Sequence, residues 1–581
     1  MNKELPALGR GKGPIPPHET WRMMHDTLET NVDPMGVAMP LLHAQLAWLS
    51  HPQELAEALS EFSTRALALG WYSWLRAWGQ HSEDPLQPNP DDTRFADPIW
   101  QESASWDIVK EWYLLMTRQI QDMLFETPGL SGKERRRAAF WWRKWLNAMA
   151  PTNFLLTNPV AMRLAVETRG ESLMRGLQNW LADVQAGTVR MTRPDDFTVG
   201  KNLATTPGKV VLRNRLVEIL HYAPTQQSVH RTPLVFVTPW INKFYILDLS
   251  AKKSMIKFLL DQGFDVYLTS WKNPGPELRD VGFENYLAEG IAPLIDVARA
   301  ISGASKVNAV GYCIGGAALA TYLAWANRQY APAEVPIESA TFFTTLVDYH
   351  KPGDIEVFLD EGSVAWLSRS MRERGYIDGK EMAAAFRLLR SNSLIWHYVV
   401  HGYLYGEEPP PFDVLYWNMD TTRLPAAMHE WYLREFYLDN KLIRKDALTV
   451  LGQKIDLSRI VQPTYAVAAE DDHIAPWRET FRLNNFVAGD KRFVLSTSGH
   501  ILGIVNPPVN PPKRKFWAGK AERHDSAEAW RDEAELHAGS WWEDWVQWLR
   551  VRSGERGEAP ALVSEAWPAL GDAPGSYVLE H

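Results

Sequence analysis

The chain has 581 residues, of which 45% are hydrophobic and 23% charged, and its net charge is −9. This composition is typical of a soluble globular protein with more than one domain, and the negative charge argues against a broad nucleic-acid-binding surface. The single cysteine, Cys313, excludes disulfides within one chain and thiolate zinc sites, and it fits a reducing, cytoplasmic setting. Residues 1–17 lack the apolar core of a secretory signal, and asparagine and glycines interrupt the uncharged stretch 307–327. We therefore expect no secretion and no membrane span.

Residues 1–190 predict a helical N-terminal domain. Apolar residues recur at helical spacing in 41–75 and 107–125, and residues 171–186 form a third predicted helix that ends at Gly187. The segment 82–104 is rich in proline and aspartate, which predicts a loop. No group of catalytic residue types occurs in this part of the sequence.

Tryptophan is unusually frequent, with 27 residues in the chain. Trp71, Trp74 and Trp78 fall on one face of a predicted helix, and residues 140–146 mix aromatic with basic side chains. An aromatic core between packed helices is one interpretation. The other is an exposed surface that binds an apolar partner, since tryptophan is favoured at interfaces.

From about residue 197 short apolar strands alternate with helices. This alternation predicts a mostly parallel sheet with its ligand site at the carboxyl ends of the strands. An aromatic-rich insertion, 348–447, interrupts the pattern. We therefore predict an α/β core, 191–347 and 448–581, with the insertion as a cap over its active site. The predicted strands are 210–212, 217–220, 234–237, 265–270, 307–310, 340–346, 464–469 and 492–495, and the predicted helices are 254–262, 283–301 and 317–328.

Cys313 lies between the predicted strand 307–310 and the predicted helix 317–328, in the sequence Gly311-Tyr312-Cys313-Ile314-Gly315-Gly316. This is the pattern of a nucleophile elbow, G-x-S-x-G, with cysteine in the serine position. The glycines leave room for a sharp strand-to-helix turn. A buried cysteine on a glycine-rich turn would give the same short pattern, so the motif alone leaves both interpretations open.

Two late strands end in polar loops that supply possible partners for Cys313. The order Cys313, Asp472, His500 is that of the α/β-hydrolase fold. His500 would deprotonate the thiol, and a carboxylate would orient the imidazole. Glu470 and Asp471 remain alternatives to Asp472.

An acyl-transfer site also needs donors for an oxyanion. The backbone N–H of Ile314 is the first candidate, and the second lies in the loop after 234–237, around Trp240 and Ile241. We find no metal-ligand spacing and no cofactor motif, and we expect neither a metal nor a cofactor.

Longer motifs carry a family resemblance. From about residue 150 to the C-terminus the chain resembles polyhydroxyalkanoate (PHA) synthases of the α/β-hydrolase superfamily, and Tyr312 makes its cysteine box similar to that of the single-subunit class I enzymes. The motifs are Pro151-Thr152-Asn153-Phe154, Gly170-Glu171-Ser172-Leu173, Val199-Gly200-Lys201-Asn202, Ile241-Asn242-Lys243-Phe244, the cysteine box, Asp472-His473-Ile474, Ser498-Gly499-His500 and Gly539-Ser540-Trp541-Trp542.

The resemblance implies an acyltransferase that polymerises (R)-3-hydroxyacyl-CoA, with the short-chain 3-hydroxybutyryl-CoA as the expected substrate, and releases CoA. Cys313 would carry the acyl group or growing polyester as a thioester, and His500 would deprotonate Cys313. Asp472 would orient His500 or assist deprotonation of the 3-hydroxyl, and His473 would be a supporting residue. The sequence Thr238-Pro239-Trp240 departs from the Pro-Pro common in the family and leaves the acyl-length preference open.

The resemblance also implies a homodimer formed through the cap, a cytoplasmic location at PHA granules, and phasin-like partners. Two other functions stay open at this point. One is a cysteine hydrolase on the same fold, either a thioesterase or an intracellular PHA depolymerase, with water as acceptor. The other is a non-catalytic granule scaffold, which the Cys-Asp-His set does not favour.

Overall fold

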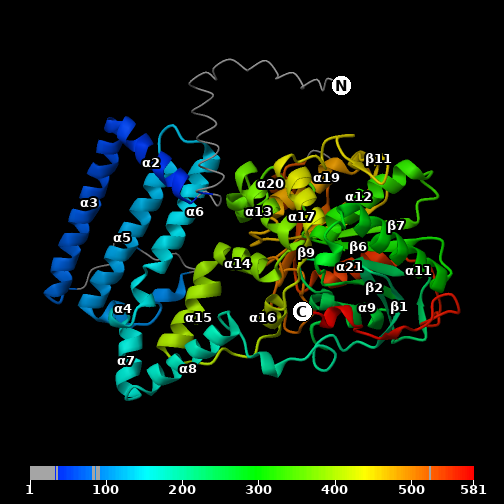
Figure 1. Ribbon diagram of the computed structural model, residues 1–581, viewed down its shortest axis with the longest axis horizontal. Helices are drawn as coiled ribbons and strands as arrows, with labels where there is room; N and C mark the ends of the chain where they lie inside the picture. The colour runs from blue at the N-terminus through cyan, green and yellow to red at the C-terminus, as the bar shows by residue number, and fades with distance from the viewer. Residues whose placement is uncertain (1–32, 34–36, 81–85, 87–91, 523–524) are drawn as a thin grey trace, which may run out of the picture.

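The computed structural model describes residues 33, 37–80, 86, 92–522 and 525–581. Residues 1–17 and part of the predicted loop 82–104 lie outside the described residues. Figure 1 shows the N-terminal helices at one end of the molecule and the large sheet at the other, with elements of the insertion between them.

Within the described residues, the core is an 11-stranded sheet with the order β15-β14-β13-β12-β7-β6-β4-β5-β2-β1-β17. The neighbours from β5 to β13 are parallel, and the outer pairs are antiparallel. The predicted α/β-hydrolase class is thus confirmed at its centre. The strands are β1 Gly208–Arg213, β2 Val217–Tyr222, β4 Leu234–Val237, β5 Val266–Trp271, β6 Val307–Tyr312, β7 Ile337–Phe343, β12 Thr464–Ala469, β13 Lys491–Ser496, β14 Lys515–Lys520, β15 Glu535–Ala538 and β17 Gly571–Asp572.

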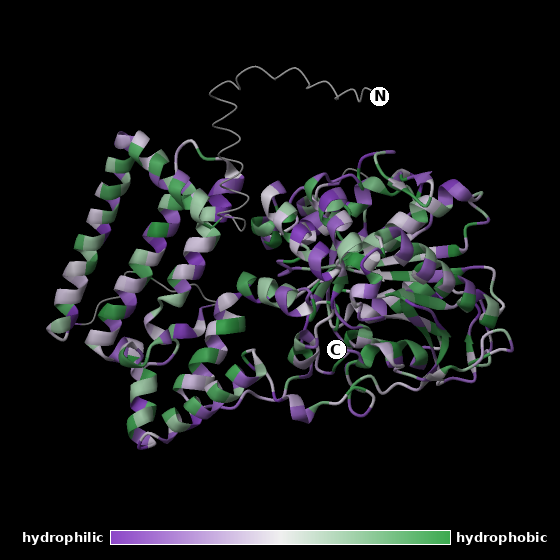
Figure 2. Ribbon diagram, viewed as in Figure 1, coloured by the Kyte–Doolittle hydropathy of each residue, from purple (hydrophilic) through white to green (hydrophobic). Residues whose placement is uncertain are grey.

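The central strands are buried on both faces, because helices cover the sheet on each side. Their sequences are therefore mostly apolar and lack a regular polar alternation, although Asn308 in β6 and Thr464 in β12 are buried polar residues. In Figure 2 the strands that are visible in the sheet are mostly green, the colour of hydrophobic residues. The main helices of the core are α9 Met255–Asp261, α11 Ala292–Ser302, α12 Ile314–Gln329, α18 Trp477–Phe481, α20 Ala527–Glu533 and α21 Trp541–Arg550.

Two sequence predictions need correction in detail. The predicted helix 41–75 is two helices, α2 Ala38–Ser50 and α3 Pro52–Ala77, because Pro52 has no N–H to continue the first helix and suits the start of the next. The predicted helix 283–301 contains a π-helical turn, Tyr286–Ile291, before α11. There Gly290 lies against Trp271, and a Cβ on Gly290 would come within 2.3 Å of the Trp271 ring.

Further helices of the N-terminal region are α5 Ala104–Glu126, α6 Gly132–Ala148, α7 Pro159–Glu167 and α8 Glu171–Ala186. The predicted helices 107–125 and 171–186 are confirmed as α5 and α8, whereas α6 and α7 are not among the predicted helices. The predicted loop 82–104, however, contains a 3-10 turn, Thr93–Phe95, and the short helix α4 Ile99–Glu102. No helix in the part of the chain that the structure describes combines the length and apolarity needed to cross a membrane.

The tryptophans divide into two groups. Trp71 and Trp74 on α3, and Trp78 directly after its end, are 63%, 52% and 73% exposed, and the first two rings stack with 5.1 Å between centroids. Trp541 and Trp545 on α21 are fully buried under the sheet. The buried group forms part of the core, whereas binding of an apolar partner by the exposed group stays a prediction.

The insertion follows β7 and ends before β12. Its helices α13, Glu361–Arg374, and α17, Ala426–Tyr432, pack against each other, and the segments β8 Tyr376–Ile377 and β9 Leu424–Pro425 pair beside them. In Figure 1 its helices α14 Gly379–Leu389 and α15 His397–Val399 extend toward the N-terminal helices, while α16 Asp413–Met419 returns to the core. The boundaries of the three predicted domains stay predictions.

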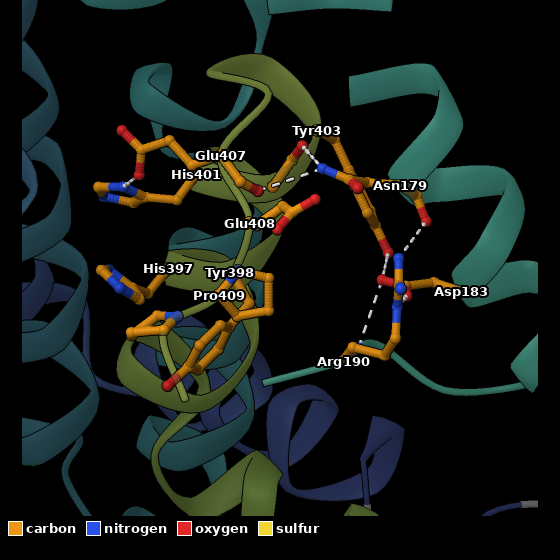
Figure 3. Close-up of a pocket in the computed structure, with 12 residues that line it drawn as sticks. Asn179, Asp183, Arg190, His397, Tyr398, His401, Tyr403, Glu407, Glu408 and Pro409 are labelled. Carbon is orange, nitrogen blue, oxygen red and sulfur yellow. Dashed lines mark hydrogen bonds and ion pairs between the residues drawn. The ribbon is translucent and has the colours of Figure 1, made fainter. Parts of the chain in front are cut away.

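A polar cavity of about 60 Å³ marks the contact between α8 and residues 397–410 of the insertion (Figure 3). Its side chains bind one another. Asp183 accepts from Arg190 and, at 2.9 Å, from the Tyr403 hydroxyl, while the Asn179 amide donates to the Gly402 carbonyl at 3.0 Å. None of the predicted site residues lines this cavity. We interpret the cavity as part of an interface that joins α8 to the insertion.

Candidate active site

Cys313 lies at the carboxyl end of β6, directly before α12. Its backbone angles, φ +53° and ψ −120°, lie in a region that residues other than glycine rarely adopt. Its N–H donates to the Phe343 carbonyl of β7 at 2.9 Å, and its side chain is half-buried. This is the strained strand-to-helix turn expected of a nucleophile elbow.

The glycines around Cys313 are required by close backbone packing. A Cβ on Gly311 would lie 2.5 Å from the Gly316 Cα, and a Cβ on Gly315 would lie 2.3 Å from the Val237 carbonyl oxygen. A Cβ on Gly316 would lie 1.9 Å from the Thr345 hydroxyl. The glycines therefore bring the start of α12 directly against the end of β4.

We expect Gly315→Ala to destabilise the fold by about 2 kcal/mol or more, because the new methyl group would meet backbone that cannot move aside cheaply. Gly70→Ala in α3 is the matched control. A Cβ there meets nothing within 4 Å, and alanine should raise helix stability by up to about 1 kcal/mol. Denaturant unfolding of both variants measures the difference. Equal stability of the two variants would contradict the packing argument.

The structure brings Asp472 and His500 together. Nδ1 of His500 donates to Oδ2 of Asp472 at 2.6 Å, and both residues are buried. The other carboxylate oxygen, Oδ1, accepts from the N–H groups of Ile474 and Ala475 at 2.8 and 2.9 Å. The carboxylate is therefore fixed by its own loop and orients the imidazole, which leaves Nε2 free for proton transfer.

His500 is electrostatically tuned. Its burial alone would lower its pKa, but the charge of Asp472, their hydrogen bond and the interaction with Cys313 together raise the pKa of His500 to about 10. An imidazole with this pKa holds its proton near neutral pH. Such a group favours the thiolate of a neighbouring cysteine, which is the nucleophilic form.

The alternatives to Asp472 are engaged elsewhere. Glu470 pairs with Arg531, and Asp471 is exposed. His473 is not the charged partner of this pair. Burial, followed by the positive charge of Arg390, lowers the pKa of His473 to about 4, so its imidazole is neutral. The geometry thus selects Asp472 as the carboxylate partner of His500.

The loop that carries His500 is anchored by the C-terminal helix α21. The indole N–H groups of Trp541 and Trp542 donate to the carbonyls of Gly503 and Ile504 at 2.8 and 2.9 Å, and the Ser540 hydroxyl donates to the Asn506 carbonyl. The sequence signal for this contact is the Gly539-Ser540-Trp541-Trp542 motif, whose role does not follow from the sequence alone. Trp541 and Trp542 thus hold the loop that carries His500 in place through their indole N–H groups.

The candidate oxyanion donors lie at the contact between α12 and the loop after β4. In the described part of the chain, none of the hydrogen bonds has the backbone N–H of Ile314, Trp240 or Ile241 as its donor. The Trp240 side chain is 2% exposed and packs on Tyr286, with 4.2 Å between ring centroids. Its bulk therefore fills the core and does not project into an entrance.

Three buried tyrosines of the insertion lie within electrostatic range of Cys313, and sequence analysis did not identify them. Burial raises the pKa of Tyr349, Tyr432 and Tyr437, and the negative charge of the nearby Cys313 thiolate contributes to each shift. The hydroxyls of Tyr349 and Tyr432 lie 3.4 Å apart. The insertion therefore reaches Cys313.

Among the described residues no group of three histidine, cysteine, aspartate or glutamate side chains could hold a metal ion.

The sheet, the elbow and the Asp472–His500 pair define a protein of the α/β-hydrolase superfamily with a cysteine in the nucleophile position. Two family models match the chain. The α/β-hydrolase fold model covers residues 233–507, and the model for the N-terminus of poly-β-hydroxybutyrate polymerase covers residues 91–259.

Curated proteins are similar over most of the chain. A poly(3-hydroxyalkanoate) polymerase from Methylorubrum extorquens is 42% identical, over 91% of this chain and 88% of its own length. The corresponding polymerase subunit of Cupriavidus necator is 40% identical, over 84% of this chain and 83% of its own. The polymerase subunit of Rhizobium etli is 38% identical, over 95% of this chain and 87% of its own length. The chain belongs to the poly(3-hydroxyalkanoate) polymerase family, which confirms the resemblance found in the sequence.

Proposed function

We propose that the protein is an acyltransferase that polymerises (R)-3-hydroxyacyl-CoA, with 3-hydroxybutyryl-CoA as the principal substrate, into polyhydroxyalkanoate with release of CoA. The observation that carries the proposal is the strained Cys313 elbow beside the buried Asp472–His500 pair, in a chain of the polymerase family. Coenzyme A enters as part of the substrate, so the reaction needs no resident cofactor.

The first step loads the nucleophile. His500 takes the proton of the Cys313 thiol, and the thiolate attacks the carbonyl carbon of the acyl-CoA thioester. The N–H groups of Ile314 and of the 240–241 loop stabilise the resulting oxyanion. The carbon–sulfur bond to CoA then breaks, and His500 returns the proton to the departing CoA thiolate. The acyl group is now a thioester of Cys313.

The second step extends the chain. The 3-hydroxyl of another hydroxyacyl-CoA attacks the Cys313 thioester while His500, oriented by Asp472, accepts the hydroxyl proton. An ester bond forms, the thiol of Cys313 is regained, and the longer chain is now a CoA thioester. Its transfer back to Cys313 releases one CoA. Water would hydrolyse the same thioester. Because His500 is buried, water is excluded from it, and this favours the 3-hydroxyl as the acceptor.

A single incubation separates this function from the alternatives. The purified protein is supplied with (R)-3-hydroxybutyryl-CoA while free CoA and turbidity are followed together. We expect CoA release accompanied by insoluble polyester. Release of CoA with soluble hydroxy acid would instead identify a cysteine hydrolase, and no CoA release would identify a non-catalytic granule scaffold.

We further propose that the protein works as a homodimer in the cytoplasm at the surface of the polyester granule, where it also meets phasin-like proteins. The support for granule contact is the row of exposed tryptophans on α3, since an amphipathic ring suits the boundary between water and an apolar polymer. The dimer rests on the family alone.

Replacing Trp71, Trp74 and Trp78 together by serine should reduce co-sedimentation with poly(3-hydroxybutyrate) particles by about tenfold, because three neighbouring exposed aromatic side chains are lost. Turnover of soluble substrate should stay near that of wild type. Val551→Ser, which removes an exposed apolar side chain elsewhere, is the control and should bind normally. Wild-type sedimentation of the triple variant would contradict this role of α3.

A further inference from the structure

A segment of the insertion, residues 420–423, holds the loop that follows β4. The hydroxyl of Thr422 is buried between two backbone carbonyls and shares its one hydrogen between that of Ile241, at 2.6 Å, and that of Trp240, at 3.0 Å. The neighbouring Thr421 forms a β-bridge with Asn242. Thr422 is about 180 residues away in sequence from the loop it holds.

These contacts fix the direction of the free amides. In a trans peptide the C=O and N–H point in opposite directions. With the Trp240 carbonyl held by Thr422, the N–H of Ile241 is directed away from Thr422 and keeps no hydrogen-bond partner among the described residues. On the other side, Gly315 of α12 lies against the carbonyls of Val237 and Thr238, so the loop and the elbow are in direct contact.

The segment that carries Thr422 is itself held from two sides. Asp420 forms a buried ion pair with Lys243, with 2.6 Å between Oδ1 and Nζ, and accepts from the Tyr245 hydroxyl at 2.8 Å. The N–H of Arg423 donates to Asn273 at 2.9 Å, and its guanidinium donates to the carbonyl of the last residue, His581, at 3.1 Å. Thr422 is therefore a fixed point from which the loop is oriented.

We propose that Thr422 is a positioning residue for the oxyanion hole: through two carbonyls of the 240–241 loop it directs an amide toward the acyl group on Cys313. The inference rests on the proposed function, since it assumes acyl transfer at Cys313. It assigns to the insertion a part in the chemistry, beyond covering the site. Displacing the insertion would release the loop and weaken the oxyanion hole.

The test compares Thr422→Val with Thr422→Ser in the full chain, by initial rates of CoA release from (R)-3-hydroxybutyryl-CoA. Valine keeps the shape and loses the donor, whereas serine keeps the donor. We expect valine to lower kcat by about 10- to 100-fold with KM within about threefold of wild type, since a misplaced oxyanion donor costs turnover more than binding. Serine should retain at least about a third of the wild-type kcat. Thermal unfolding midpoints of both variants are measured alongside.

Any of these kinetic outcomes overturns the inference: valine with the wild-type kcat, valine and serine with equal losses, or a valine effect confined to KM. A loss of kcat that follows the unfolding midpoint in both variants would also overturn it, because Thr422 would then be structural. Failure of the proposed function gives a different result. If wild type releases CoA but makes no polymer, polymerisation is refuted, yet the valine-to-serine comparison still tests the oxyanion hole.

Discussion

Replacement of Cys313 by serine should lower the rate of CoA release by about 10⁴-fold or more, because the nucleophile of both acyl-transfer steps is lost. A serine hydroxyl in the same place has a pKa far above that of a thiol, and a histidine tuned for a thiolate cannot deprotonate it well. The change is nearly isosteric, so the free energy of unfolding should stay within about 0.5 kcal/mol of wild type. Rates of CoA release and denaturant unfolding measure the two quantities.

The chain supplies its own control for this variant. Cys313 is the only cysteine, so a thiol reagent labels at most one site per chain. We expect alkylation of the wild type to abolish CoA release and excess substrate to slow the labelling. A folded Cys313→Ser protein with more than about a tenth of the wild-type activity would contradict a role as nucleophile.

The second large effect is expected for Asp472→Asn. The change removes the negative charge beside His500, while an amide oxygen can still accept from the N–H groups of Ile474 and Ala475 and keep the loop in place. We expect kcat to fall by about 10³- to 10⁴-fold, because the imidazole loses both its orientation and the charge that stabilises its protonated form. Asp471→Asn, one residue earlier and exposed, is the matched control and should leave kcat near wild type.

The same variant has a predictable effect on stability. The pKa of His500 is raised from 6.5 to about 10 in the folded protein, so protonation of His500 stabilises the fold. This contribution is complete below pH 6.5 and is lost as pH rises toward and through 10. The stability difference between wild type and Asp472→Asn should therefore be largest near pH 6 and shrink toward pH 10. Denaturant unfolding across this range measures it, and a difference that grows with pH would contradict the assigned charge state.

The centre of the fold could be predicted from the sequence because its signals are local. The buried strands 234–237, 307–310 and 464–469 are apolar runs, and Gly311 and Gly315 mark a turn that only glycine fits. The pairing of Asp472 with His500 followed from chain order, since loops after neighbouring parallel strands meet at one edge of the sheet.

Other features depend on contacts between distant segments and left no local pattern. The antiparallel strands β14 and β15 are partly exposed, and neither contains a long apolar run that would mark it as a strand. The hydrogen bond from Thr422 to Trp240 joins residues 182 apart, and the short polar segment 420–423 has no periodicity that would mark its role. The motif at 539–542 was visible, but its role required the position of α21 under the His500 loop.

The most direct test of the central claim is mass spectrometry of the peptide that contains Cys313, taken from protein quenched during turnover of (R)-3-hydroxybutyryl-CoA. If the polyester grows from this thiol, the Cys313 peptide will carry a ladder of masses spaced by one hydroxybutyryl unit, sensitive to hydroxylamine and absent from Cys313→Ser. A Cys313 peptide that stays unmodified while polymer accumulates would contradict the claim.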